Sequence, residues 1–276
     1  MSDKASGRFP VIGNVEVAPC VYRLDFDAPN VARSAKPGQF VMIRPAGAGT
    51  SPLLARPFSL YRLWPEEGRA AVLFRVVGEG TRELARLRPG EQLSVVGPLG
   101  RGFVFDQSLE TAYLVAGGMG VAPIAALAEF LFRAGVPATI FYGLRSESEV
   151  VPEARDLLAD CASELITACE EGFSGAGTKT AKMAACQGLV TDPLSVWLAL
   201  EARPIFACGP RPMLKKVAEL SQEFQAPAQV SLETHMACGF GVCLGCVTPL
   251  RDKNGAARWG RVCTEGPVFR GEEVAW

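Results

Sequence analysis

The sequence predicts a multidomain protein of the β plus α/β class, with a β domain, a Rossmann-like parallel α/β domain and a small cysteine-rich module in that order. Three observations predict this class. Short β-branched runs separated by Gly and Pro turns fill the first part of the chain, strand and helix patterns alternate in the middle, and four spaced cysteines lie near the end. We place the domains at residues 1–108, 109–228 and 229–276, because 276 residues are enough for more than one core.

The first domain contains short runs of strand-forming residues bounded by turn chemistry such as Pro-Gly and Gly-Pro. Many short strands with this punctuation are typical of a barrel or a sandwich. One helix interrupts the pattern; Thr81 can cap it and Pro89 ends it. The predicted strands span residues 40–43, 71–77 and 92–96, and the helix spans 81–87.

The middle domain alternates strands and helices, which predicts a mostly parallel sheet covered on both faces. A glycine-rich turn, Gly117-Gly118-Met119-Gly120, joins the first strand to a helix, where backbone amides can receive a pyrophosphate. The full G-x-G-x-x-G fingerprint is absent, so a plain tight turn is the alternative. Cys208, Gly209 and Pro210 follow another strand at its carboxyl end, where open α/β sheets bind ligands. The predicted strands span residues 112–116, 138–144 and 204–208, and the helices span 122–133 and 213–224.

The last domain carries the most specific pattern, C-x4-C-x2-C followed by a fourth cysteine after a long gap. Plant-type [2Fe–2S] ferredoxins use the same spacing, and the intervening glycines suit a loop that wraps a cluster. A four-cysteine zinc site and a pair of disulfides are the alternatives, although zinc sites usually use two short knuckles. The candidate ligands are Cys238, Cys243, Cys246 and Cys263. The remaining cysteines (Cys20, Cys161, Cys169, Cys186 and Cys208) lack ligand spacing, and we expect them to be ordinary small residues that are buried or semi-buried.

Charge and composition exclude several classes of protein. The net charge is −1 and no basic, aromatic-rich patch stands out, so nucleic acid is not an expected partner. No apolar run is long enough to span a bilayer and no signal peptide opens the chain, so we expect a cytoplasmic protein. With one histidine and no Ser/His/Asp set, acid–base catalysis is not expected. His235 reads as a structural neighbour of the cysteine loop, and Trp276 as a frayed terminus rather than a lid.

Two further motifs lie in the β domain. Arg56-Pro57-Phe58-Ser59 offers a guanidinium fork that suits a diphosphate, and Gly78-Glu79-Gly80-Thr81 offers backbone amides and a hydroxyl. A surface ion pair and a simple helix-entry turn are the alternative interpretations.

Taken in order, these motifs resemble the ferredoxin–NADP reductase superfamily, in which a β-barrel binds flavin and an α/β domain binds a pyridine nucleotide. The motifs are Arg-Pro-Phe-Ser, Gly-x-Gly-Thr, Gly-Gly-Met-Gly-Val-Ala-Pro and Cys-Gly-Pro-x-Pro-Met-Leu. The cysteine motif, with Arg-Val-Cys-Thr-Glu-Gly-Pro around Cys263, narrows the resemblance to electron-transfer subunits of dihydroorotate dehydrogenase B, which carry a [2Fe–2S] cluster. The resemblance covers nearly the whole chain.

The resemblance implies a role for each motif. The FAD residues would be Arg56, Pro57, Phe58, Ser59, Leu73, Phe74, Arg75, Gly80 and Thr81, with Arg56 on the phosphate and Ser59 nearest the flavin N5 edge. The NAD residues would be Gly117, Gly118, Gly120, Cys208, Gly209 and Pro210, and the four candidate cysteines would ligate the cluster. Two departures matter: Phe58 stands where the superfamily often has tyrosine, and the segment 169–187, in which Glu170 or Glu171 would contact the nucleotide ribose, is unusually long.

The implied function is an electron relay in pyrimidine (UMP) biosynthesis. Electrons would pass from the FMN of a separate dihydroorotate dehydrogenase catalytic subunit, through [2Fe–2S] and FAD, to NAD⁺, in a heterotetramer with two of each subunit. The alternatives are an electron-transfer subunit of another NAD(P)H-linked complex (a ferredoxin or sulfide oxidoreductase, or a hydrogenase reductase subunit), a self-contained NADH oxidase, and a non-enzymatic iron–sulfur sensor on a reductase scaffold.

Overall fold

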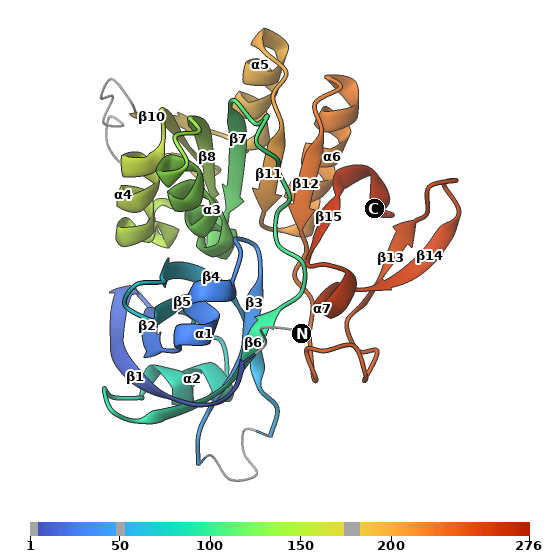
Figure 1. Ribbon diagram of the computed structural model, residues 1–276. Coiled ribbons are helices and arrows are strands. Elements are labelled where there is room, and N and C mark those ends of the chain that lie inside the picture. The colour runs from blue at the N-terminus through green and yellow to red at the C-terminus, as the bar shows by residue number, and fades with distance from the viewer. Residues whose placement is uncertain (1–4, 48–52, 174–182) are drawn as a thin grey trace.

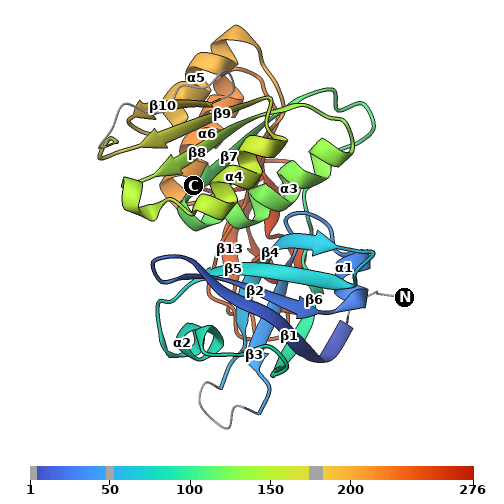
Figure 2. The same ribbon diagram turned by 90° about the vertical axis from the view of Figure 1, so that its left-hand side faces the viewer.

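The computed structural model describes residues 5–47, 53–173 and 183–276 and contains three parts (Figure 1). A β-barrel lies below an α/β sheet, and the C-terminal residues form a third part beside both. The view in Figure 2 shows the barrel strands curling under the helices of the α/β part. None of the helices in the described ranges is long and apolar enough to cross a membrane.

The first part is a closed, antiparallel six-stranded barrel. Of the two architectures that the sequence allowed, a barrel or a sandwich, the barrel is the one that forms. Side chains such as Phe26, Ile43 and Val72 fill its interior because alternate residues of each strand point inward. The strands predicted over 40–43 and 92–96 fall within β3 and β6, and the one predicted over 71–77 extends two residues past the end of β5. Its elements are β1 (Ala5–Ala18), β2 (Val21–Asp27), α1 (Pro29–Ser34), β3 (Phe40–Pro45), β4 (Arg56–Trp64), β5 (Arg69–Arg75), α2 (Glu79–Ala85) and β6 (Gln92–Leu99).

Helix α2 begins two residues earlier than predicted, and Thr81 is not its N-cap. Gly78 occupies the N-cap position, and the Thr81 hydroxyl reaches back to it. That hydroxyl accepts hydrogen bonds from the backbone N–H groups of Val77 (2.9 Å) and Gly78 (3.1 Å) and donates to the Gly78 carbonyl (3.0 Å). Thr81 therefore organises the turn from within the helix.

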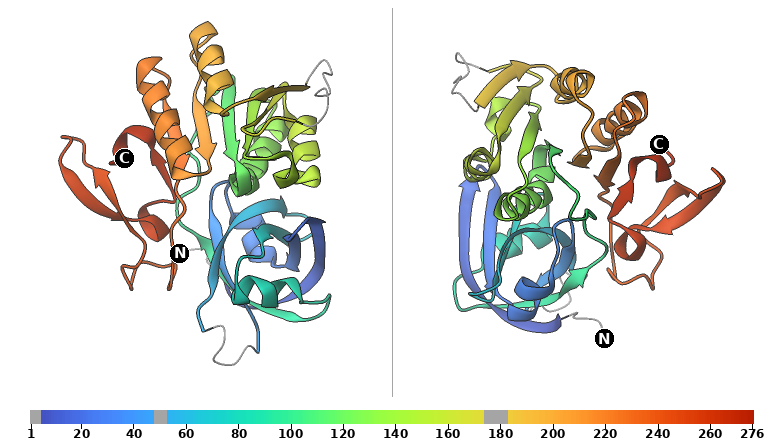
Figure 3. Two further views of the ribbon diagram at one scale, coloured as in Figure 1. Left: turned by 180° about the vertical axis from the view of Figure 1, so that it is seen from behind. Right: turned by 45° about the horizontal axis from the view of Figure 1, so that its top comes forward.

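The second part is a seven-stranded sheet in the order β10-β9-β8-β7-β11-β12-β15, parallel except for β15. Helices α3 and α4 pack on one face and α5 and α6 on the other (Figure 3), which explains why β7, β8 and β11 are buried along their whole length. The elements are β7 (Ala112–Gly117), η1 (Gly118–Gly120), α3 (Val121–Arg133), β8 (Ala138–Leu144), η2 (Glu147–Glu149), α4 (Pro152–Cys161), β9 (Glu164–Cys169), β10 (Met183–Gln187), α5 (Thr191–Leu200), β11 (Ile205–Cys208), α6 (Arg211–Glu223), β12 (Ala228–Ser231) and β15 (Val268–Arg270).

The third part leaves the sheet after β12 and returns to it through β15, so the sheet holds both of its ends. Between them lie the cysteine loop, a hairpin of β13 (Val247–Arg251) and β14 (Ala257–Arg261), and α7 (Val262–Glu265); η3 (Gly271–Glu273) follows β15. The division at residues 108 and 228 stays a proposal for the folding units.

The C-terminus is docked rather than frayed, contrary to the expectation for Trp276. Its indole Nε1 donates to the Gly271 carbonyl (3.1 Å), and the Arg211 guanidinium lies 5.6 Å from its ring centroid. Arg211 also donates to the Ala275 carbonyl (3.2 Å), so the last residues pack at the start of α6. A hydrogen bond and a cation–π contact of this kind fix an amphipathic ring in place.

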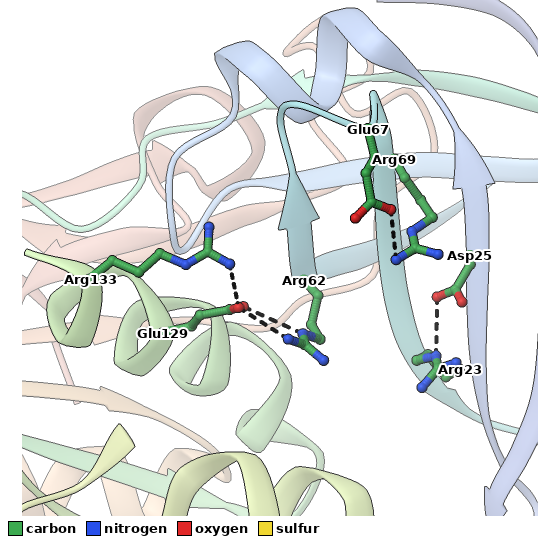
Figure 4. A network of polar contacts seen from close by, with 7 residues as sticks. All are labelled: Arg23, Asp25, Arg62, Glu67, Arg69, Glu129 and Arg133. Atoms are coloured by element: carbon green, nitrogen blue, oxygen red, sulfur yellow. Dashed lines mark hydrogen bonds and ion pairs between the residues drawn. The ribbon is translucent and has the colours of Figure 1, made fainter. Parts of the chain in front are cut away.

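The barrel and the α/β part meet through contacts in which the barrel supplies arginines and the α/β part supplies glutamates. Arg62 of β4 donates to both carboxylate oxygens of Glu129 on α3 (3.1 and 3.4 Å), and Arg133 reaches the same carboxylate (2.6 Å; Figure 4). Arg23 of β2 pairs with Glu153 on α4 (2.5 Å). Because the positive charges lie on the barrel and the negative charges on the α/β part, the two surfaces are complementary in charge where they meet.

We expect Glu129→Gln to destabilise the protein by roughly 1–3 kcal/mol, between the effects for exposed and buried ion pairs. The Glu129 side chain is 13% exposed, and losing its charge leaves Arg62 facing Arg133 without a counter-ion. Chemical denaturation would measure the loss. Glu83→Gln is the matched control, because Glu83 pairs with Arg86 (2.8 Å) where both side chains are exposed; equal effects of the two substitutions would refute a special role for the interface pair.

Candidate cofactor sites

A cavity of about 630 Å³ opens where the three parts meet. The barrel contributes most of its wall, α3 and η1 contribute Ala122 and Met119, and the segment after β12 closes the third side. All the predicted FAD residues except Gly80 line it, namely Arg56, Pro57, Phe58, Ser59, Leu73, Phe74, Arg75 and Thr81. A mostly apolar cavity with a few polar groups is typical of a cofactor site.

Gly80 lies directly under the Arg56 side chain. A Cβ at position 80 would stand 2.2 Å from Arg56 Nε, so only glycine lets the guanidinium lie against the start of α2. The Arg56 Nη1 also donates to the Leu54 carbonyl, which holds the fork at the cavity edge. The second glycine of Gly-x-Gly-Thr, Gly80, thus leaves space for the Arg56 side chain. The Thr81 hydroxyl is already hydrogen-bonded within its own turn.

Two aromatic rings form part of the cavity wall. Phe58 of β4 and Phe74 of β5 lie with ring centroids 5.4 Å apart, and Tyr22 stacks behind Phe74 at 5.9 Å. The packing role expected of the motif's aromatic residue is therefore available to Phe58 without a hydroxyl.

The segment 231–236, which the sequence analysis did not assign to this site, forms the third wall. It includes Glu233, where desolvation raises the pKa of the carboxyl, and His235, which is exposed and lines the cavity. The signal that could have found these residues is their position directly after the carboxyl end of β12, the edge at which parallel sheets bind ligands.

The two predicted nucleotide turns pack on each other. Strands β7 and β11 are parallel neighbours with Ala116 opposite Cys208, which brings their carboxyl ends together. A Cβ at Gly120 would stand 2.2 Å from the Cys208 carbonyl oxygen, and one at Gly117 would stand 2.7 Å from Pro210 Cδ. Gly118 differs, because its φ is +51° and nothing lies within 4 Å of its Cβ position.

Close packing alone thus explains Gly117 and Gly120, as the tight-turn alternative requires, whereas Gly118 leaves room for a ligand to approach the backbone. Contact of these turns with NAD stays a prediction. Of the two ribose candidates, Glu171 pairs with Arg145 (3.4 Å), and both glutamates are exposed just after β9. Part of the long segment, residues 174–182, lies outside the described residues.

The four candidate cysteines gather as two pairs. The Cys238 sulfur is hydrogen-bonded to the Cys243 thiol, and Cys263 to the Cys246 thiol. Among the described residues, no three histidine, cysteine, aspartate or glutamate side chains surround one metal-ion position. Pairs of thiols suit a two-iron cluster with two thiolates on each iron better than one tetrahedral zinc ion.

Backbone amides prepare this loop for thiolates. Desolvation acts to raise the pKa of Cys238, but N–H groups of Cys243, Phe240 and Val242 donate to its sulfur and lower the pKa to about 6. Desolvation, together with the Cys246 sulfur acting as acceptor for the Cys263 thiol, raises the pKa of Cys263 to about 12, opposed by the Gly241 N–H. Cys246 and Cys263 are buried and Cys243 is exposed, so one side of the loop faces solvent.

The loop is held from both sides. Gly239 (φ +79°) packs against the barrel, where its Cβ position lies 2.5 Å from Met42 Cγ, and Met42 is the β3 residue opposite Pro57 of the cavity wall. Gly241 (φ +88°) packs against Thr264 of α7, and its carbonyl accepts a hydrogen bond from Arg261 (3.3 Å). The candidate cluster site and the cavity are thus separated by one β-strand pair.

Comparison with known proteins gives consistent similarities. Residues 233–275 match the sequence model described as the iron–sulfur cluster binding domain of dihydroorotate dehydrogenase B. The chain is 34% identical to the dihydroorotate dehydrogenase B (NAD(+)) electron transfer subunit of Desulforamulus reducens, with 94% of each chain covered, and 35% identical to that of Geobacillus thermodenitrificans, with 97% of each covered.

Solved structures show the same architecture. An NADH-dependent reduced ferredoxin–NADP oxidoreductase, studied for flavin-based electron bifurcation, superposes with a TM-score of 0.79 at 30% identity over 99% of this chain and 91% of the other. A ferredoxin NADP⁺ reductase from Neisseria gonorrhoeae with bound FAD and NADP superposes at 0.61 with 12% identity, over 81% of this chain and 92% of the other, which shows the fold alone.

Proposed function

Since the chain belongs to the family of dihydroorotate dehydrogenase B (NAD⁺) electron transfer subunits, we propose that it relays electrons between a separate FMN-containing catalytic subunit and NAD⁺. It is an oxidoreductase subunit of pyrimidine biosynthesis and acts on dihydroorotate only together with that partner. The observation that carries the proposal is the packing of the four-cysteine loop on the barrel: Gly239 contacts Met42 of β3, the strand partner of Pro57, which lines the cavity.

FAD, when bound, exchanges electrons in pairs with a nicotinamide or singly with an iron–sulfur cluster. We assign the cavity to it. Arg56 binds the diphosphate, with Gly80 and Thr81 shaping the turn beneath it, and Phe58 packs against the ring system. Ser59 lies on the same strand and also lines the cavity, where it would be the residue nearest the flavin N5 edge. Gly118 offers its backbone to NAD beside the cavity residue Met119.

The cysteine loop fits a [2Fe–2S] cluster. The paired arrangement of the four cysteines, and the backbone N–H groups that lower the pKa of Cys238, suit a cluster held by thiolates. The Thr264 hydroxyl is a buried polar atom without a hydrogen-bond partner among the described residues, on the inner side of the same loop. Cys238 and Cys243 would hold one iron, and Cys246 and Cys263 the other.

The partner would dock over the exposed side of the loop. Phe240, Val242 and Leu244 are 52%, 74% and 58% exposed, an apolar rim beside Cys243, and exposed apolar residues that cluster are typical of an interface. We propose a heterotetramer with two catalytic and two electron-transfer subunits. We also propose a cytoplasmic location, where thiols stay reduced.

A second candidate is the corresponding subunit of another NAD(P)H-linked complex. The similarity to the reduced ferredoxin–NADP oxidoreductase, at 30% identity over nearly the whole chain, favours this alternative. The two candidates differ in their partner rather than in their cofactors.

The test begins with anaerobic purification and quantification of iron, sulfide and flavin, followed by reduction with NADH. We expect about two irons, two sulfides and one FAD per chain, with both chromophores bleached. Dihydroorotate, NAD⁺ and the FMN-containing catalytic subunit are then added, and NADH formation is expected. Zinc instead of iron, or absent flavin, would refute the relay and favour the sensor. Full cofactors with no NADH formation would favour the second candidate.

A further inference from the structure

The Thr264 side chain lies against the cysteine loop and carries a buried hydroxyl. Its Oγ1 is shielded from solvent, and no hydrogen-bond partner for it lies among the described residues. A buried hydroxyl left without a partner costs free energy, so an unpaired one in a native fold calls for a partner. The partner must lie on the side of the hydroxyl that protein atoms do not occupy.

The surroundings show where that side is. Thr264 follows Cys263 and packs on Gly241, with its Cγ2 at 2.9 Å and its Oγ1 at 3.4 Å from the Cβ position of that glycine. Gly241 in turn donates its N–H to the Cys263 sulfur. The hydroxyl therefore lies against the cysteine loop at Gly241, on the residue that directly follows the candidate ligand Cys263.

The other polar side chains of this short segment are already engaged. Arg261 donates to the Gly241 carbonyl (3.3 Å) and pairs with Glu265 (3.5 Å). Glu265 also accepts from Arg258 (2.7 Å) and from the Arg261 backbone N–H (2.9 Å). Among these side chains, the Thr264 hydroxyl is thus the donor for which the described residues offer no acceptor.

We propose that the Thr264 hydroxyl donates a hydrogen bond to a sulfur atom on the Cys263 side of the [2Fe–2S] cluster and thereby raises the cluster's reduction potential. The inference rests on the proposed cluster. Reduction adds negative charge to the cluster, and a donor to its sulfur stabilises the reduced state more than the oxidised one. Thr264 then sets how readily the cluster accepts an electron, beyond merely holding the loop.

The test is a redox titration of the purified holoprotein, followed by electron paramagnetic resonance of the reduced cluster. Thr264→Val keeps the shape and removes the donor, and we expect the equilibrium to shift about tenfold towards the oxidised cluster, or about 59 mV for a one-electron couple. Thr264→Ser keeps a hydroxyl and should keep the wild-type potential. Exchange into D₂O should remove a proton coupling near the cluster in wild type that is absent in Thr264→Val.

Each outcome decides the matter. Equal potentials in wild type and Thr264→Val, with full iron and sulfide, would overturn the proposal while leaving the cluster assignment intact. If Thr264→Val does not load iron, Thr264→Ala replaces it in the same titration. Failure of both to load, with Thr264→Ser loaded and FAD retained, would mean that Thr264 only supports the loop and would overturn a tuning role. Absence of iron and sulfide in the wild type would instead refute the proposed function.

Discussion

Cys243→Ser is expected to lower dihydroorotate-to-NAD⁺ turnover of the assembled complex by about a hundredfold or more, because serine cannot replace a thiolate ligand of the cluster. NADH should still reduce the FAD of the variant subunit at close to the wild-type rate. The cavity and the nucleotide turns lie on other elements, and Cys243 is exposed, so its substitution disturbs no core. Stopped-flow reduction by NADH and coupled turnover measure the two halves separately.

Cys20→Ser is the matched control, because Cys20 is also an exposed free cysteine but lies at the tip between β1 and β2. It should leave iron content, flavin reduction and coupled turnover unchanged. Coupled turnover at the wild-type level in Cys243→Ser, with the lower iron content verified, would contradict a relay through the cluster.

Gly80→Ala is expected to weaken FAD binding by about tenfold or more, the effect of losing one good charge-assisted contact. The added methyl group would occupy the position of the Arg56 guanidinium, 2.2 Å from Nε and 2.3 Å from Cζ. Arg56 must then swing away, so the site loses its fork although every charged residue is still present. Fluorescence titration of the apoprotein with FAD measures the dissociation constant.

Gly78→Ala controls for the alanine itself. Gly78 lies in the same turn, its φ of −168° is extended backbone that any residue adopts, and nothing lies within 4 Å of its Cβ position. Its effect on FAD binding should therefore be small. If both alanines weaken binding equally, the turn rather than the placement of Arg56 governs affinity.

The elements that were predicted best from the sequence are those whose side chains all meet the same kind of environment. The strand predicted over residues 138–144 coincides with β8, because a strand with helices on both faces needs apolar residues throughout. The helix predicted over 122–133 starts one residue early, at Val121, since the glycine turn marks its beginning. The cysteine motif could be recognised because three of its four candidate ligands are close in sequence.

The features that sequence could not predict depend on contacts between distant segments. The docking of Trp276 requires Arg211 of α6, and the third wall of the cavity requires the chain after β12 to turn towards the barrel. Thr81 looked like a helix cap because hydroxyls favour that position, yet its hydroxyl accepts hydrogen bonds from the backbone N–H groups of Val77 and Gly78, four and three residues earlier. No local pattern encodes the two long-range contacts, whereas the Thr81 residue type fits both positions within one turn and does not decide between them.

The docking of Gly239 against Met42 and Leu99 has a consequence for how this protein can be rebuilt. The cysteine segment enters from one strand of the sheet, leaves through another, and fits its loop to a surface made by the barrel. It is therefore not an independent cassette. Transplanting it to another reductase would require two features of the recipient: a free sheet edge like that of β12, and a barrel surface on which a glycine can pack. Without either feature, the grafted segment would keep its cysteines but not the contacts that position them.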